Sequence, residues 1–313
     1  MHKLLKDSPG DNVMLLGNEA IARGAIEAGV AFATTYPGTP SSEISLNLFQ
    51  MSQESDLYFE YSPNEKVALE VAAGAANSGL RTFCMMKHVG LNVAADPLMT
   101  LAYVGVTGGM VILSADDPSM FSSQNEQDNR YYAKFGNLPM LEPSSVPEAK
   151  EMIKYAFELS EELQQPVLMR TTTRINHSNA FVTFGDIKER VTKGRFERDP
   201  YRCVTVPAVS RGLHVKVLEK MAKAGTLSES SDFNLLEGSG TLGIIANGVS
   251  FHYAQDAVTD LGLQADAKLF RLGFSNPMPE KKIKDFLKTC EKVLVIEEGE
   301  PFMEEAVKGF AQE

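Results

Sequence analysis

Short apolar runs that alternate with helical patterns are the feature that most constrains this fold. Residues 13–17 are apolar and end in Gly, and a helical pattern follows them as far as Gly29. Residues 30–36 are rich in β-formers and are followed by a turn and a second helical pattern. Four further strands are predicted after it, at residues 57–61, 81–86, 109–114 and 166–172, with a short fifth at 140–143. Strand–turn–helix repeats of this kind predict an α/β fold built on a parallel sheet.

A second, smaller unit of the same kind follows. Its predicted strands are residues 241–246, 268–271 and 292–297, with helices between them. We therefore divide the chain into a first domain at 1–187, a linker and helix at 188–235, and a second parallel α/β domain at 236–313. Two domains are also what the 313-residue length favours.

The composition excludes several classes of function. A net charge of −11 argues against a nucleic-acid partner, which would require a basic surface. No run of apolar residues approaches the length of a membrane span or a signal peptide, so we expect no membrane partner and a cytoplasmic location. The three cysteines are scattered and form no Cys-x-x-Cys pair, so no metal site is predicted in this chain.

A helix over residues 61–79 has an unusual composition. Ser62 is predicted as its N-cap, Pro63 suits its first turn, and Gly79 suits its end. Small residues fill its interior: Ala68, Ala72, Ala73, Gly74, Ala75 and Ala76. Such a surface would let a large group approach the helix backbone. Glu65 lies in the first turn, where a carboxylate ordinarily does no more than stabilise the helix dipole.

Polar residues follow two of the predicted strands. The turn 37–40 contains Thr39. Its hydroxyl group and the start of the following helix suit an anion-binding site, but a well-capped loop with no ligand explains the same residues equally well. Lys87, His88 and Asn92 follow the strand at 81–86, where ligands bind in parallel sheets. The polar stretch 119–132 is either a solvated loop or an active-site loop. Glu297, Glu298 and Glu300 are expected to be solvated.

Several common catalytic signatures are absent. The sequence has no phosphate-binding P-loop, no dinucleotide-binding glycine pattern after a strand, no Gly-x-Ser-x-Gly elbow and no zinc-binding pair. It also lacks the Gly-Asp-Gly motif with a later Asn by which thiamine diphosphate enzymes hold Mg²⁺.

Longer blocks resemble one enzyme family. Glu65 and the small residues after it resemble the cofactor-activating helix of thiamine diphosphate enzymes, and residues 36–43 resemble a block of the 2-oxoacid:ferredoxin oxidoreductases. Four stretches, at residues 17–20, 86–99, 122–133 and 170–174, are similar to the alpha subunit of the indolepyruvate:ferredoxin oxidoreductase family. The resemblance covers essentially the whole chain but only the N-terminal half of that subunit.

The resemblance implies a fold and a set of site residues. It implies a pyrimidine-binding domain followed by a transketolase C-terminal-like domain. Glu65 would be catalytic, hydrogen bonded to N1′ of the aminopyrimidine. The remaining residues carried over are cofactor-binding Pro37, Gly38, His88, Gly90 and Asn92, and substrate-binding Thr39, Lys87 and His88.

The same resemblance implies partners that this chain does not contain. Mg²⁺ and the 4Fe–4S clusters would be bound by domains outside it. A 2-oxoacid, coenzyme A and ferredoxin would be the reactants, and oxidative decarboxylation to an acyl-CoA the reaction. We expect a homodimer, a complex with a chain that carries the missing domains, or both, and little activity without those domains.

Two other interpretations stay open at this stage. The chain could be the pyrimidine half of a split transketolase or of a 2-oxoacid dehydrogenase E1 beta subunit, because domain order and length fit both. It could also be a non-catalytic interaction subunit with a degenerate site.

Overall fold

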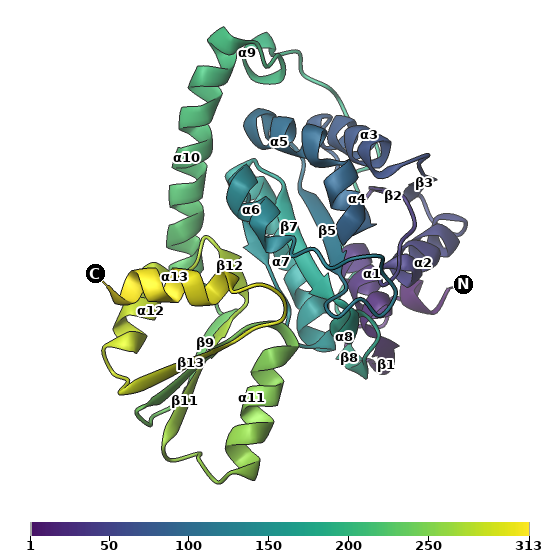
Figure 1. Cartoon of the computed structure of the whole chain (residues 1–313). Coiled ribbons are helices and arrows are strands. Elements are labelled where there is room, and N and C mark those ends of the chain that lie inside the picture. The colour runs from purple at the N-terminus through teal and green to yellow at the C-terminus, as the bar shows by residue number, and fades with distance from the viewer. Residues whose placement is uncertain (1, 313) are drawn as a thin grey trace.

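The computed structural model describes residues 2–312 and confirms a two-part α/β architecture (Figure 1). The larger part is a seven-stranded sheet with the order β12-β6-β7-β5-β4-β2-β3. All its neighbouring strands run parallel except β12, which is antiparallel to β6. The strands are β2 (Phe32–Thr35), β3 (Tyr58–Tyr61), β4 (Thr82–Lys87), β5 (Met110–Asp116), β6 (Met140–Leu141), β7 (Val167–Thr172) and β12 (Phe274–Asn276).

Helices cover both faces of this sheet and give it two apolar cores. One core contains buried residues of α1 (Gly17–Glu27), α2 (Ser42–Ser52) and α7 (Val146–Leu163). The other contains residues of α3 (Glu65–Asn77) and α5 (Ala95–Val104). Because both faces are buried, the central strands contain continuous apolar runs, and every residue of β5 is buried.

The first predicted strand does not join the parallel sheet. β1 (Asn12–Leu16) instead pairs antiparallel with β8 (Asn179–Thr183), a strand that the sequence analysis missed. Leu15 and Val182 bury their side chains in the first core, while the preceding residues Met14 and Phe181 stay exposed. A short apolar run indicates a strand but carries no information about its pairing partner.

The region between the two sheets contains more helix than predicted. After the irregular stretch to residue 199, the predicted linker and helix segment contains two helices, the short α9 (Pro200–Cys203) and the long α10 (Pro207–Ser230). Figure 1 shows α10 as a long green helix along one side of the molecule. Two short elements were not predicted, η1 (Lys3–Leu5) and α8 (Thr173–Asn176).

The smaller part is a four-stranded sheet with the order β13-β10-β11-β9. β10 (Leu242–Ala246) is parallel to β11 (Ala267–Leu272) and to β13 (Lys292–Ile296), but β9 (Asn234–Gly238) is antiparallel and was missed. Its helices are α11 (Gly248–Asp260), α12 (Glu280–Leu287) and α13 (Phe302–Ala311). The pairing of β12 with β6 also joins this part of the chain to the large sheet. The proposed domain limits stay a prediction.

Candidate functional site

The predicted site residues come together at one edge of the large sheet. Thr39 follows β2, Glu65 follows β3, and His88 follows β4. These three strands are neighbours and run parallel, so their carboxyl ends lie side by side. Such an edge is where α/β sheets place their ligands.

Glu65 is the first residue of α3, so its neighbours set its position. Asn64 is the N-cap, and its side chain accepts a hydrogen bond of 3.0 Å from the Val67 amide. The predicted cap at Ser62 and first-turn position of Pro63 are therefore wrong, since both precede the helix. Asn caps at least as well as Ser, so the sequence offered two adequate solutions.

The Glu65 carboxylate is buried and has no partner from another residue in the described chain. Its residue is 8% exposed, and within residues 2–312 no other residue donates a hydrogen bond to the carboxylate or forms an ion pair with it. Burial raises the pKa of Glu65, and its own backbone amide offsets this only in part. A buried carboxylate without a partner is costly, so this arrangement is typical of a functional group awaiting a ligand.

Gly90 lies directly against Glu65. It belongs to α4 (His88–Val93), a helix that the sequence analysis did not predict. A Cβ atom at Gly90 would lie 2.6 Å from Glu65 Oε1 and 2.7 Å from Glu65 Cγ. These distances are shorter than van der Waals contacts, so only glycine leaves Glu65 in its present position.

We expect Gly90→Ala to displace the Glu65 side chain and to lower any activity that depends on Glu65 about tenfold to a hundredfold. The added methyl overpacks the site, which costs roughly 1–3 kcal/mol of unfolding free energy. Gly74→Ala is the matched control, because an added Cβ there meets nothing within 4 Å. That substitution should stabilise α3 by about 1 kcal/mol and leave activity unchanged. Equal activity of the two variants would contradict the role of Gly90.

The small residues of α3 do not form the open surface that the sequence analysis expected. Ala68, Ala72 and Ala76 are fully buried in the second core, together with residues of β4 and α5. Gly74 faces solvent. The small side chains therefore serve close packing of α3 on the sheet, and only the first turn of α3 reaches the site.

The turn after β2 packs against the end of β4. A Cβ at Gly38 would lie 2.7 Å from the Lys87 Cβ atom. Pro37 is exposed, and Gly38 and Thr39 are half-buried. Lys87 Nζ donates to the Ser122 carbonyl oxygen over 2.7 Å. The structure thus brings the turn, Lys87 and part of the polar stretch 119–132 together.

His88 is fully buried and holds the polar loop in place. Its Nε2 lies 3.1 Å from the Asn125 carbonyl oxygen, and a carbonyl only accepts, so Nε2 carries the proton. Its Nδ1 forms no hydrogen bond with any described residue. Asn129 Nδ2 donates to the His88 carbonyl over 3.0 Å. Asn92 Oδ1 accepts a hydrogen bond from the Tyr132 hydroxyl, which fixes the far end of α4.

Sequence reasoning missed Asp117, which organises the same loop. Its carboxylate accepts hydrogen bonds from the Ser122 amide, the Ser123 hydroxyl and the Thr173 hydroxyl, at 2.6–2.7 Å. Burial raises the pKa of Asp117, but these hydrogen bonds outweigh it and hold the pKa below its usual value. The signal in the sequence was an acidic pair, Asp116-Asp117, at the end of a strand.

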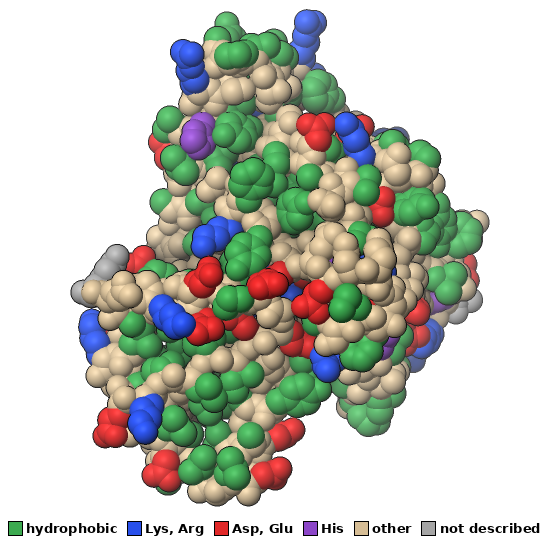
Figure 2. Space-filling model, in the orientation of Figure 1, with side chains coloured by type: hydrophobic (Ala, Val, Ile, Leu, Met, Phe, Trp, Pro, Cys, Tyr) green, Lys and Arg blue, Asp and Glu red, His purple; other side chains and the backbone are tan. Residues whose placement is uncertain are grey.

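The acidic residues after β13 are largely not solvated, which corrects the sequence-based expectation. Arg130 Nη1 donates to Glu297 Oε2 over 2.5 Å, and Thr172 and Arg174 hydrogen bond the Glu298 carboxylate. Of the three acidic residues, only Glu300 is exposed. Acidic side chains gather where the small unit meets the large one (Figure 2). Sequence distance hides this pairing, because the partners are more than 120 residues apart.

Residues 23–209 match a model of the family described as "Pyruvate flavodoxin/ferredoxin oxidoreductase, thiamine diP-bdg". This match covers more than half of the chain. The chain belongs to this family. This match to the pyruvate flavodoxin/ferredoxin oxidoreductase family confirms the resemblance from which the site residues were assigned. The roles of those residues stay predictions.

Curated relatives of this family member carry a more specific name. It is 49% identical over 314 residues to an indolepyruvate oxidoreductase subunit IorA of Methanothermobacter thermautotrophicus, covering 99% of this chain and 50% of that relative. It is 50% identical over 315 residues to a protein of the same name from Thermococcus kodakarensis, covering 98% of this chain and 48% of the relative. The chain thus spans about half the length of these relatives.

Solved structures confirm the fold of this pyruvate flavodoxin/ferredoxin oxidoreductase family member. A 2-oxoglutarate:ferredoxin oxidoreductase from Magnetococcus marinus superposes with a TM-score of 0.79 at 17% identity, covering 96% of this chain and 60% of the other. A split-gene transketolase in an inactive β4 tetramer superposes with a TM-score of 0.63 at 16% identity, covering 95% and 85%. Both structures show the same α/β arrangement. Within residues 2–312, no helix combines the length and apolar character that crossing a membrane requires.

Proposed function

We propose that this chain supplies the pyrimidine-activating half of a thiamine diphosphate site in a 2-oxoacid:ferredoxin oxidoreductase that acts on indolepyruvate or a related aryl pyruvate. The observation that carries the proposal is the buried, unpaired Glu65 at the carboxyl edge of the sheet. The family match supports the cofactor, and the printed names of the relatives support the substrate.

The residues present fit the pyrimidine end of this cofactor. Glu65 would share a proton with ring nitrogen N1′, because a carboxyl group of raised pKa is a good partner for a weakly basic nitrogen. The cofactor, when bound, supplies the electron sink that decarboxylation of a 2-oxoacid requires. Gly90, with Pro37 and Gly38 opposite, would leave room for the ring, and Asn92 would border it.

The substrate would lie beside the turn after β2 and the end of β4, which pack against each other. The Lys87 ammonium is the one positive charge among the assigned residues, so it would attract the substrate carboxylate. The Thr39 hydroxyl has no hydrogen-bond partner in the described chain and could donate to the same carboxylate. His88 is buried, so its contribution would be to hold the 119–132 loop over the site, with its free Nδ1 as an acceptor.

The residues present do not fit the remaining cofactors of such an enzyme. Residues 2–312 contain no group of three or more His, Cys, Asp or Glu side chains arranged to hold a metal ion. We therefore propose that Mg²⁺ and the 4Fe–4S clusters are bound by other polypeptide, in a complex that also receives coenzyme A and ferredoxin. That complex would contain a second copy of this chain, a chain with the missing domains, or both. The three free thiols suit a reducing cytoplasm.

The test uses a full-length chimaera in which this chain replaces the matched half of the Methanothermobacter relative. We expect the chimaera, assembled with the remaining subunits of that complex, to reduce ferredoxin when indolepyruvate, coenzyme A and thiamine diphosphate are supplied. The 313-residue chain alone should show no turnover. Activity of the isolated chain, or ketol transfer without ferredoxin as in a transketolase, would overturn the proposal. Preference for 2-oxoglutarate over indolepyruvate would overturn the substrate assignment alone.

A further inference from the structure

The smaller sheet ends in a strand whose outer edge is open. β13 pairs with β10 on one side, and no strand within residues 2–312 pairs with its other side. Four consecutive residues of β13, from 293 to 296, are apolar, and Leu294 is 53% exposed. Proteins ordinarily protect such edges with charged residues, proline or a covering element, because a bare edge pairs with other strands.

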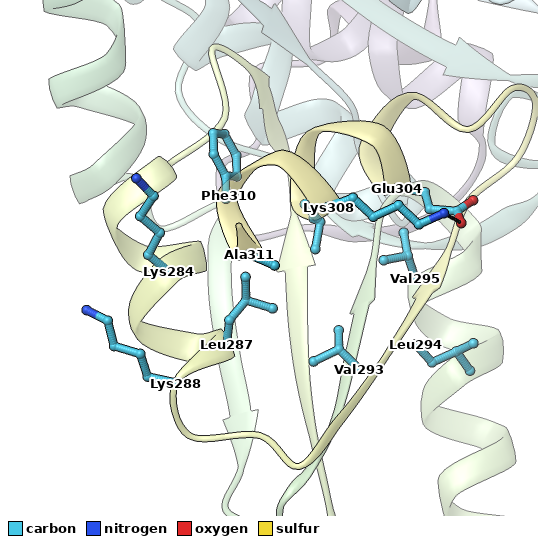
Figure 3. A pocket seen from close by; sticks show the side chains of 11 residues that line it. Lys284, Leu287, Lys288, Val293, Leu294, Val295, Glu304, Lys308, Phe310 and Ala311 are labelled. Atoms are coloured by element: carbon cyan, nitrogen blue, oxygen red, sulfur yellow. Dashed lines mark hydrogen bonds and ion pairs between the residues drawn. The ribbon is translucent and has the colours of Figure 1, made fainter. Parts of the chain in front are cut away.

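A cavity of about 740 Å³ lies beside this edge, between β13 and the helices α12 and α13. Leu287, Val293, Val295, Phe310 and Ala311 line it (Figure 3). Figure 3 shows the Val293 side chain on the same side of β13 as Leu287 and the Leu294 side chain on the other side of the strand, and Leu294 also borders the cavity. Apolar side chains therefore lie on both faces of β13, as they do in an interior strand.

The position of α13 explains the cavity. In this sheet α11 connects β10 to β11, and α12 connects β11 to β13. A helix in such a repeat packs over the strand before it and the parallel strand after it. α13 follows β13 in the chain and packs beside α12, but within residues 2–312 no strand follows it. The cavity lies where the side chains of a strand paired to β13 would project.

The charges at the rim are already compensated. Lys284 and Lys288 pair with Glu280 and Asp285 at 2.8 and 3.0 Å, and Lys308 pairs with Glu304. An anionic ligand would have to compete with these carboxylates. The groove therefore suits an apolar strand held by backbone hydrogen bonds, the binding mode called β-augmentation.

We propose that β13 is the docking edge for a β-strand of the polypeptide that forms the unmatched half of the longer relatives. About half of the length of these relatives lies outside the match with this chain, so the family has polypeptide to supply such a strand. The strand adds a fifth member to the small sheet and fills the cavity beneath α13. The small unit is thereby the place where the two halves of the enzyme are joined.

Amide hydrogen exchange tests the proposal. In the isolated chain, those amides of residues 293–296 that point away from β10 should exchange at least tenfold faster than in the full-length chimaera. Val293→Glu in the chimaera should restore fast exchange, because a charge in the groove opposes docking. Leu261→Glu is the matched control, since Leu261 is 71% exposed in the same unit and lies outside the groove; it should leave the protection intact.

A second variant distinguishes loss of docking from misfolding of β13 caused by Val293→Glu. Phe310→Glu changes the groove from α13 without altering β13, and it should restore fast exchange as Val293→Glu does. Equal exchange in the isolated chain and the chimaera would overturn the proposal. So would protection in the isolated chain that accompanies a dimer and disappears with Val293→Glu, because a second copy would then cover the edge.

Discussion

Glu65→Gln is expected to lower ferredoxin reduction by the assembled chimaera at least about a hundredfold. Glutamine keeps the size of the side chain but cannot share a proton with N1′, so the proton transfer that the carboxylate supports is lost. General acid–base contributions of this kind are worth about 10²–10⁴ in rate. Substrate binding should change little, so the loss should appear in kcat at saturating 2-oxoacid.

The same substitution is expected to stabilise the isolated chain. Burial disfavours the charged form of Glu65, and its pKa is raised in the folded state. Stability is therefore lost as pH rises above the pKa of the unfolded state, about 4.3, and the full penalty is present above the folded-state pKa. The neutral glutamine side chain carries no such penalty. The gain should be on the order of 1 kcal/mol at neutral pH, or a few degrees in Tm, and should vanish below about pH 4.

Glu70→Gln is the matched control, because Glu70 lies in the same helix and is exposed. It should change neither kcat nor Tm. Full activity of the Glu65→Gln chimaera would instead favour a non-catalytic interaction subunit. A fall in Tm with Glu65→Gln would show that the carboxylate is a structural group rather than one awaiting a ligand.

Arg130→Ala is expected to destabilise the chain by about 3–5 kcal/mol, the usual cost of removing one partner of a buried ion pair. The Arg130 side chain is fully buried, and it forms ion pairs with Asp128 and Glu297, whose side chains are 2% and 8% exposed. It also donates to the carbonyl oxygens of Glu298 and Glu300, at 3.1 and 2.8 Å. Its removal leaves two buried carboxylates without this guanidinium and detaches the loop after β13 from the large unit. Urea unfolding of the isolated chain measures the loss.

Lys188→Ala gives the scale for an exposed pair. Lys188 and Glu158 lie 2.7 Å apart, but each side chain is 52% exposed, so this substitution should cost less than about 1 kcal/mol. Similar effects of the two substitutions would contradict the role of Arg130 as the link between the units.

The effect of Arg130→Ala should also depend on pH. Burial raises the pKa of Asp128, but Arg130 and Arg170 outweigh it and hold the pKa below its usual value. This contribution to stability is present above the unfolded-state pKa of about 3.9 and is lost as pH falls through the folded-state pKa. The difference between wild type and Arg130→Ala should therefore shrink in acid.

The elements of the large sheet could be predicted from the sequence because their signal is local. A run such as residues 81–86 is apolar whichever neighbours it has, so β4 was placed within a residue or two of its observed limits. Pairing is not local. β1 was expected in the parallel sheet but pairs with β8, and the antiparallel edge β9 was missed, because strand type alone does not select a partner.

The site residues also fall into those that the sequence predicted and those that it did not. Glu65, Gly90 and the turn 37–40 were identified from motifs, which are contiguous in sequence. The roles of Asp117 and Arg130 could not be predicted, because their partners come from distant parts of the chain. The polar loop 119–132 was recognised as unusual, but nothing in its composition indicated that His88 holds it.

The sequence by itself determined that this chain is an α/β protein of the thiamine diphosphate-binding family, because local periodicity and contiguous motifs are written along the chain. Only the tertiary structure decided that Glu65 is buried without a partner, that Gly90 makes room for it, and that the acidic residues after β13 are ion-paired. Burial and charge pairing depend on which distant segments pack together, and the free energy that selects that packing is shared by the whole fold rather than stored in any one stretch.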